Sequence, residues 1–234
     1  MGVRRRHDLL DESVLDEFEA EGMRAAQQAR SRALVLRLFN DGLRLLEETD
    51  FDGLSIEALC ERSGSTVGAF YSRFESKEAY IVALQRLVVA QTRQAIMADY
   101  ARNAAPCASV AHLAARIVKG VLVWYARYEG IVRASLRRSN GEREMWTPIR
   151  ELGELQATMG LPQMFALLPP GAREGAQDRV RFAFQILFGV VNNMVLINPG
   201  PFGIKDPETR PMLTSALISF IEGPGDEISA RGKR

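Results

Sequence analysis

The chain has 234 residues, 47% of them hydrophobic, which is enough to build a sizeable core and excludes a wholly disordered protein. Its formal net charge is +1, which excludes a basic surface spread over the whole chain, so any nucleic-acid contact has to rest on a local cluster. Two cysteines and two histidines exclude a disulfide framework and a Cys/His metal site, so we expect no metal and no cofactor.

Residues 1–29 are predicted to be a charged N-terminal extension with a basic cluster, Arg4, Arg5 and Arg6, ahead of an acidic stretch. One interpretation is a solvated arm with a single weakly amphipathic helix through Leu10, Val14 and Phe18. The other is an arm whose arginines touch DNA phosphates or a minor groove. The extension lacks an apolar signal segment, and the longest apolar run, residues 186–191, is too short to span a membrane. We therefore expect a cytoplasmic protein with no membrane partner.

A first helix is predicted over residues 30–48, where apolar residues recur at helical spacing and no proline intervenes. Its expected buried face consists of Leu34, Leu38, Phe39, Gly42 and Leu45. Residues 50–53 have the sequence Asp-Phe-Asp-Gly, which is typical of a turn. Phe51 and Leu54 are expected to close over a small three-helix core.

The stretch 55–77 predicts two short helices joined by a tight turn. Ile56, Leu59 and Cys60 share one face of the first helix, and Ser55 is its expected N-cap. Gly64 supplies the positive φ that a sharp reversal requires. A second helix over 66–74 turns Phe70 and Phe74 inward, and the next helix begins at Lys77 after a Ser76 cap. Two helices across a short glycine turn are typical of a helix-turn-helix DNA reader.

The segment SGSTVGAFYSRFESKEAYIVAL, residues 63–84, resembles the segment that marks the tetracycline-repressor (TetR) family of bacterial transcriptional regulators. The resemblance covers residues 30–87, and beyond Gln91 it rests on the lengths and order of the helices alone. The matching features are Gly64, Gly68, the Phe70-Tyr71 pair, Phe74 and the helix start Ser76-Lys77-Glu78. It implies a ligand-responsive DNA-binding regulator with a helical effector and dimerisation domain.

The outward face of the second helix is the predicted contact with a major groove of double-stranded DNA. Val67, Gly68 and Ala69 let the helix approach base edges and thymine methyls, whereas Tyr71 and Lys77 suit phosphates, which is also the role that the resemblance implies. Arg73 reaches either a guanine edge or a phosphate, and the sequence leaves both open. The predicted DNA-binding residues are Ser55, Thr66, Val67, Gly68, Ala69, Tyr71, Ser72, Arg73 and Lys77, with Arg62 in the local basic cluster.

The rest of the chain predicts helices only, so the expected fold class is all-α. Helices are expected over 77–103, 106–128, 131–138, 174–197 and 209–221. A further helix is expected to begin at the Thr147-Pro148 pair and to kink or break at Gly160 and Pro162. The expected domains are the helix-turn-helix domain 30–76, a helical ligand-binding and dimerisation domain 77–222, and a disordered tail 223–234.

The resemblance implies an effector cavity among the central helices, and the apolar and aromatic composition there suits a small hydrophobic molecule. The candidate polar lining residues are His112, Arg116, Trp124, Tyr125, Tyr128 and Asn192. Plain core packing is the alternative for each aromatic residue. The sequence identifies no particular effector.

A homodimer is predicted through the last two long helices, because each carries an apolar stripe that a lone monomer would expose. The stripes consist of Val180, Phe184, Leu187, Val191 and Met194 or Val195 on one helix, and Leu213, Leu217 and Phe220 on the other. Two subunits would then bind a palindromic operator.

Three functions follow from these patterns. The first is a repressor released by its effector, with a co-repressor-dependent regulator as its variant. The second is an all-helical enzyme, which the sequence disfavours because it contains no HExxH, GxSxG or phosphate-binding glycine loop. The third is a helical adaptor that binds only protein.

Overall fold

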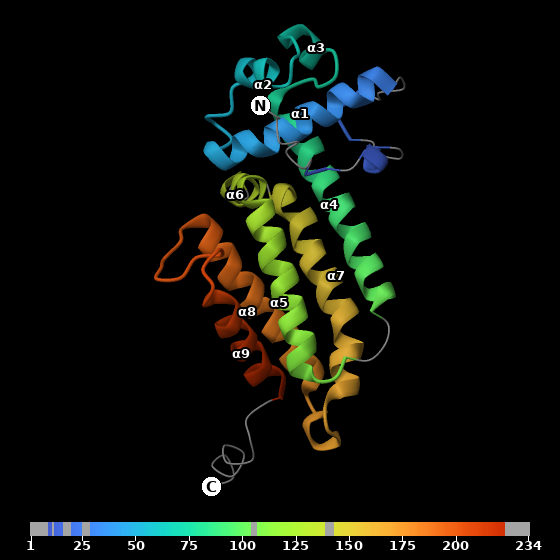
Figure 1. Cartoon of the computed structure of the whole chain (residues 1–234), viewed down its shortest axis with the longest axis vertical. Helices are drawn as coiled ribbons and strands as arrows, with labels where there is room; N and C mark the ends of the chain where they lie inside the picture. The colour runs from blue at the N-terminus through green and yellow to red at the C-terminus, as the bar shows by residue number, and fades with distance from the viewer. Residues whose placement is uncertain are drawn as a thin grey trace, which may run out of the picture. The chain divides into compact units, whose positions relative to one another are not determined.

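The protein is described by a computed structural model that covers residues 9–10, 12–15, 20–24, 29–103, 107–138 and 143–222. These residues form α-helices with two short 3-10 helices, and no strand is present among them, which confirms the all-α fold class (Figure 1). The basic cluster Arg4, Arg5 and Arg6 and the tail 223–234 lie outside the described residues. None of the described helices is both long and apolar enough to cross a lipid bilayer.

The chain divides into two compact units. The N-terminal unit comprises Met1–Ala95 with Tyr128–Ile149, and the C-terminal unit comprises Ile96–Arg127 with Arg150–Arg234. The helices are α1 (Ala29–Glu48), α2 (Ile56–Arg62), α3 (Val67–Tyr71), α4 (Lys77–Arg102), α5 (Val110–Arg127), α6 (Glu129–Arg138), α7 (Arg143–Leu167), α8 (Ala176–Leu196) and α9 (Thr209–Glu222), with 3-10 helices η1 (Glu12–Leu15) and η2 (Pro170–Ala172). In the C-terminal unit α9 packs against α5 and α8 (Figure 1).

The N-terminal unit is built on an aromatic cluster, whose four side chains come from α1, α3, α4 and the turn between the last two. Phe39, Phe70, Phe74 and Tyr80 are each 0% exposed. Their rings lie 5.0–5.6 Å apart, centroid to centroid. The Tyr80 hydroxyl donates a hydrogen bond of 2.8 Å to the Leu38 carbonyl, so its one polar atom is satisfied. Burial raises the pKa of Tyr80 well above its ordinary value, which keeps this hydroxyl a donor.

The helix α1 is placed as predicted, but its buried face differs in detail. Leu38, Phe39 and Gly42 are buried, whereas Leu34 and Leu45 are half-buried. The sequence prediction omitted three further core residues of α1, Val35, Leu43 and Leu46. The face is wider because α1 packs against both α2 and α6, on different sides.

The helix α7 contradicts the predicted start and the break, one of the two outcomes expected at Gly160 and Pro162. It begins at Arg143 rather than at Thr147, and it continues without a break past Gly160 and Pro162 to Leu167. A buried face of Met145, Ile149, Leu152 and Met164 extends along its length, and this packing outweighs a penalty of about 3 kcal/mol for an interior proline. A Cβ on Gly160 would lie 3.1 Å from the Tyr100 hydroxyl oxygen, so this glycine permits close packing rather than ending the helix.

The predicted apolar stripes of α8 and α9 are largely the core of the C-terminal unit itself. The buried members are Val180, Phe184, Leu187, Val191, Val195, Leu213 and Leu217. Of the predicted interface residues, only Phe220 is exposed, at 41%. The premise that a monomer exposes these stripes is therefore wrong, because α8 and α9 bury them against each other and against α5.

The close approach of Tyr80 to α1 gives a testable prediction. A Cβ on Gly42 would lie 1.8 Å from the Tyr80 hydroxyl oxygen. Gly42→Ala should therefore destabilise the protein by about 1–3 kcal/mol, as overpacking does, despite the gain in helix propensity. Urea unfolding followed by circular dichroism measures this change. Tyr80→Phe removes the nearest atom, so the double variant should lose less stability than the sum of the two single variants.

The matched control is Gly120→Ala, a helix-interior glycine whose added Cβ meets nothing within 4 Å. It should raise stability by up to about 1 kcal/mol. Equal effects of the two glycine substitutions would contradict the packing account of Gly42.

Candidate nucleic-acid interface

The first helix of the motif is capped as predicted. The Ser55 hydroxyl accepts a hydrogen bond from the Ala58 amide at 3.2 Å and donates one to the Glu57 carboxylate at 2.8 Å. The Glu57 amide and the Ser55 hydroxyl lower the pKa of the Glu57 carboxyl. Ile56, Leu59 and Cys60 are buried, as their spacing predicted. Ser55, a predicted DNA-binding residue, thus uses its hydroxyl at the start of α2.

The turn between the two motif helices is a Schellman motif. The Ser65 amide donates to the Cys60 carbonyl at 2.8 Å, and the Gly64 amide donates to the Glu61 carbonyl at 3.2 Å. Gly64 has a φ of 62°, the left-handed conformation that the sequence required of it. Two hydrogen bonds and one glycine therefore set the angle at which the chain enters α3.

The second helix of the motif, α3, is the one predicted to contact the DNA bases and is called the reading helix below. It is shorter than predicted, at five residues, Val67–Tyr71. Thr66 is its N-cap, because its side-chain oxygen accepts a hydrogen bond from the Ala69 amide at 3.1 Å. Val67 is 36% exposed and Tyr71 is 48% exposed. Of the other predicted contact residues, Thr66, Gly68 and Ser72 are exposed, whereas Ala69 and Arg73 are half-buried. The predicted face of α3 therefore lies on the surface, with Phe70 anchoring its back in the core.

Lys77 is held at the start of α4 by groups of the turn before α2. Its ammonium donates to the Asp52 carbonyl at 3.2 Å and lies 4.7 Å from the centroid of the Phe51 ring. The guanidinium of Arg138, from α6, lies 4.0 Å from the same centroid. Phe51 was expected only as a core residue, whereas it also serves as a cation–π partner for two cations.

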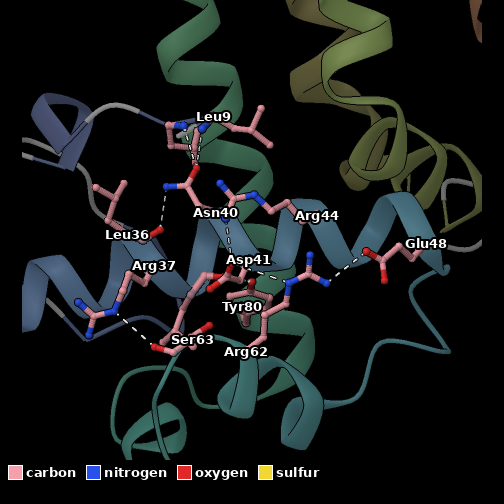
Figure 2. Close-up of polar contacts among 12 residues, drawn as sticks. Leu9, Leu36, Arg37, Asn40, Asp41, Arg44, Glu48, Arg62, Ser63 and Tyr80 are labelled. Atoms are coloured by element: carbon pink, nitrogen blue, oxygen red, sulfur yellow. Dashed lines mark hydrogen bonds and ion pairs between the residues drawn. The ribbon is translucent and has the colours of Figure 1, made fainter. Parts of the chain in front are cut away.

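Two arginines near α2 have their side chains bonded to groups of the N-terminal unit. Figure 2 shows Arg62 of α2 between Asp41 and Glu48 of α1, at 4.0 Å and 3.2 Å. The Arg37 side chain donates to the Ser63 carbonyl at 3.4 Å. Arg62, which the sequence assigned to the local basic cluster, is therefore offset by acids of α1.

The segment before α1 is attached at two points, one in α1 and one just after α3. The Asn40 side-chain oxygen accepts hydrogen bonds from the Leu9 and Leu10 amides at 2.7 Å and 3.1 Å (Figure 2). Farther along, Met23 forms an isolated antiparallel bridge with Phe74. No local sequence pattern pointed to either attachment, because each joins residues far apart in the chain.

The candidate effector residues do not form one cluster. Arg116, Trp124, Tyr125 and Asn192 lie in the C-terminal unit, where the Tyr125 hydroxyl donates to the Asn192 side-chain oxygen at 2.7 Å. Burial raises the pKa of Tyr125, so this phenol remains a neutral donor. Tyr128 instead belongs to the N-terminal unit, where its hydroxyl donates to the Leu9 carbonyl at 3.1 Å.

His112 and Arg116 sit differently on α5. The His112 side chain is exposed. Arg116 donates to the Gln163 side-chain oxygen at 3.2 Å, faces the Asp99 carboxylate at 3.7 Å, and lies 5.5 Å from the Tyr100 ring centroid. Burial raises the pKa of Tyr100 to about 12, against the opposing effect of Arg116. Arg116 thus forms a polar cluster with Gln163, Asp99 and Tyr100, and the sequence prediction named only Arg116 among them.

Comparison with known proteins agrees with this geometry. A family model described as "Bacterial regulatory proteins, tetR family" matches residues 38–84, which include α2, α3 and the turn between them. No curated protein matches the chain.

The turn generates a prediction about stability. Gly64→Ala places a Cβ in the left-handed region, where strain costs about 1–2 kcal/mol although nothing lies within 4 Å. Thermal unfolding should reveal this loss. Gly68→Ala is the control within the same motif, since its added Cβ meets only the Thr66 side-chain oxygen at 4.0 Å, and it should be neutral or stabilising. Equal losses at both positions would argue against a requirement for positive φ.

Proposed function

We propose that this chain, a TetR-family DNA-binding transcriptional regulator by the match over residues 38–84, acts in the cytoplasm as a repressor that a hydrophobic effector releases from a palindromic operator. The observation that carries the proposal is the surface of α3. Small and apolar residues are exposed there, between a capped helix start and the phosphate-suited Tyr71 and Lys77.

The two kinds of contact come from different parts of this surface. Thr66 and Val67 begin the helix and present a hydroxyl and three methyl groups, which suit base edges and thymine methyls in a major groove. Tyr71, at the end of α3, and Lys77, at the start of α4, flank them and suit the backbone phosphates on either side. Lys77 is held near its place by the Asp52 carbonyl, so little side-chain freedom is lost on binding.

These roles predict different effects of substitution. Tyr71→Phe and Lys77→Ala should weaken binding to all sequences about equally, and Lys77→Ala should lower the slope of log K against log salt by about one unit per subunit. Thr66→Ala and Val67→Ala should change which bases are preferred, by up to about 1–3 kcal/mol at a base. Binding-site selection on each variant, with titrations at several salt concentrations, measures both. A changed site preference for Lys77→Ala would reverse the assignment.

A homodimer is the proposed binding species. Two half-sites of a palindrome lie about 34–36 Å apart on one face of B-DNA, which a two-fold symmetric protein matches. Because the apolar stripes are buried within the chain, the proposed contact moves to the exposed faces of α8 and α9. Phe182 is 50% exposed and Phe220 is 41% exposed, and their ring centroids lie 5.7 Å apart in an edge-to-face pair.

This relocated interface predicts the oligomeric state of two variants. Phe182→Arg combined with Phe220→Arg should give folded monomers that bind the operator weakly, because each subunit then holds a single half-site. Analytical ultracentrifugation at micromolar concentration measures this. Phe165→Arg changes an exposed phenylalanine of α7, 41% exposed, and should leave the dimer intact. Dimers that survive the double substitution would refute the interface.

The proposed effector binds in the C-terminal unit near Trp124, Tyr125 and Asn192. Trp124 and Tyr125 form an edge-to-face ring pair with centroids 5.1 Å apart, and the Tyr125–Asn192 hydrogen bond places polar groups beside this aromatic surface. A hydrophobic molecule with one or two polar atoms suits such a setting. To release DNA, the effector has to bind more tightly to the protein conformation that does not bind DNA. An effector with equal affinity for both conformations would leave their equilibrium unchanged.

The prediction is that compounds raising the melting temperature of the full chain lower its affinity for the selected operator. Trp124→Leu should lose this response and keep operator binding, whereas Val123→Ala, at a 59% exposed neighbour, should keep both. Thermal-shift screening followed by operator titration measures the coupling. A compound that tightens operator binding would instead identify a co-repressor, the alternative function.

A further inference from the structure

The segment just before α1 is paired with the backbone that directly follows the reading helix. The Arg24 amide donates to the Arg73 carbonyl at 2.8 Å, and the Glu75 amide donates to the Gly22 carbonyl at 2.9 Å. Between these hydrogen bonds lies the antiparallel bridge of Met23 and Phe74. The pairing places Arg24 directly opposite Arg73, one residue beyond the C-cap of α3, Ser72.

The position of this pairing is set by close packing. Gly22 has a φ of 71°, and a Cβ on it would lie 2.7 Å from the Ala79 Cβ. Only glycine satisfies both conditions, so the segment approaches α4 more closely than any other residue permits. The preceding attachment at Leu9 and Leu10 is also firm, since Leu10 is 2% exposed and Asn40, which accepts both amides, is 3% exposed.

Alternation along the paired backbones assigns the side chains to two faces. Phe74, at 0% exposure, and the half-buried Met23 share the inner face. Arg24, which is exposed, and Arg73, which is half-buried, share the outer face with Glu75. Side chains directly opposite each other in an antiparallel pair have Cβ atoms about 4.5–5.5 Å apart. Two arginines are therefore neighbours beyond the end of α3.

We propose that Arg24 and Arg73 together bind a phosphate of the DNA backbone, so that a residue outside the helix-turn-helix motif contributes to DNA affinity. Two neighbouring guanidiniums can both donate charge-assisted hydrogen bonds to one phosphate, which suits this pair to the DNA backbone. The site continues the surface of Tyr71 and Lys77 past the end of the reading helix. Arg73 then positions the protein on the duplex rather than reading a guanine. This inference rests on the proposed function.

The test compares Arg24→Ala with the wild-type full chain on a duplex recovered by binding-site selection. One phosphate contact contributes about 0.9 to the slope of log K against log salt. Arg24→Ala combined with Arg73→Ala should remove this contact from both subunits of a dimer, so the affinity lost between about 50 and 200 mM salt should become roughly tenfold smaller. Arg24→Ala alone leaves Arg73 on the same phosphate and should lower the slope by a smaller amount. The selected sequence should not change. Arg93→Ala, at an exposed arginine of α4, is the matched control and should behave as wild type.

Two further variants separate charge from position. Arg24→Lys keeps the charge and should keep most of the salt slope. Gly22→Val clashes with Ala79 and should give the salt slope of Arg24→Ala, with no further decrease when the two are combined. Because the Arg24 side chain is exposed, Arg24→Ala itself leaves the core intact, and thermal unfolding verifies this.

The outcomes distinguish this inference from the proposed function. If Lys77→Ala lowers the salt slope and Arg24→Ala does not, the paired-arginine site is refuted and the regulator function stands. A changed sequence preference in Arg24→Ala also refutes it, because phosphate contacts carry no base information. If the wild-type chain selects no sequence at all, the proposed function itself fails.

Discussion

Burial of one tyrosine organises the surface that is proposed to face DNA. Tyr80 of α4 lies beneath the motif with its ring against Phe39, Phe70 and Phe74, and its hydroxyl is satisfied by the Leu38 carbonyl. A five-residue helix such as α3 has too few internal hydrogen bonds to be stable alone. Its position therefore comes from Phe70, which ties it to this cluster. The glycine at position 42 makes the arrangement possible, because any side chain there would occupy the space of the hydroxyl.

Polar contacts, together with the aromatic cluster, position α3 and the cations near it. The Schellman motif at Gly64 sets the direction of the chain into α3, and the Thr66 side chain accepts a hydrogen bond from the Ala69 amide in the first turn of that helix. Acidic side chains of α1 form ion pairs with Arg62. The net charge of the chain is only +1, and the cations that suit phosphates are each held at a particular position. Lys77 is one of these cations, because one backbone carbonyl and one aromatic ring hold it at the start of α4.

In the C-terminal unit, the apolar residues of α8 and α9 that were predicted to form a dimer interface are mostly buried within one chain. A long helix with an apolar stripe is ambiguous, because the stripe fits equally well against its own chain or against a second copy. Here α8 and α9 bury Phe184, Leu187 and Leu217 within one chain. The faces they leave exposed carry Phe182 and Phe220, and aromatic residues are enriched at protein interfaces.

What the sequence by itself determined are the features that depend on residues close together in the chain. The caps at Ser55 and Ser76, the positive φ at Gly64 and the inward Phe70 all follow from short spacings, and so they were predicted correctly, whereas Thr66 was expected inside the helix that it caps. The family resemblance was carried by the same residues. The reading helix was still predicted too long, because Phe74, which was expected inside it, instead follows it and pairs with Met23.

Only the tertiary structure decided the features that depend on contacts between distant residues. Core packing of α7 overrides Gly160 and Pro162, whose local effect is to interrupt a helix, and the mutual burial of α8 and α9 decides which of their faces remain exposed. The pairing of Arg24 with Arg73, and the Asn40 contact with Leu9, join segments that no local pattern connects. The physical reason is that backbone hydrogen bonds and apolar burial between distant segments each outweigh local preferences of a few kcal/mol.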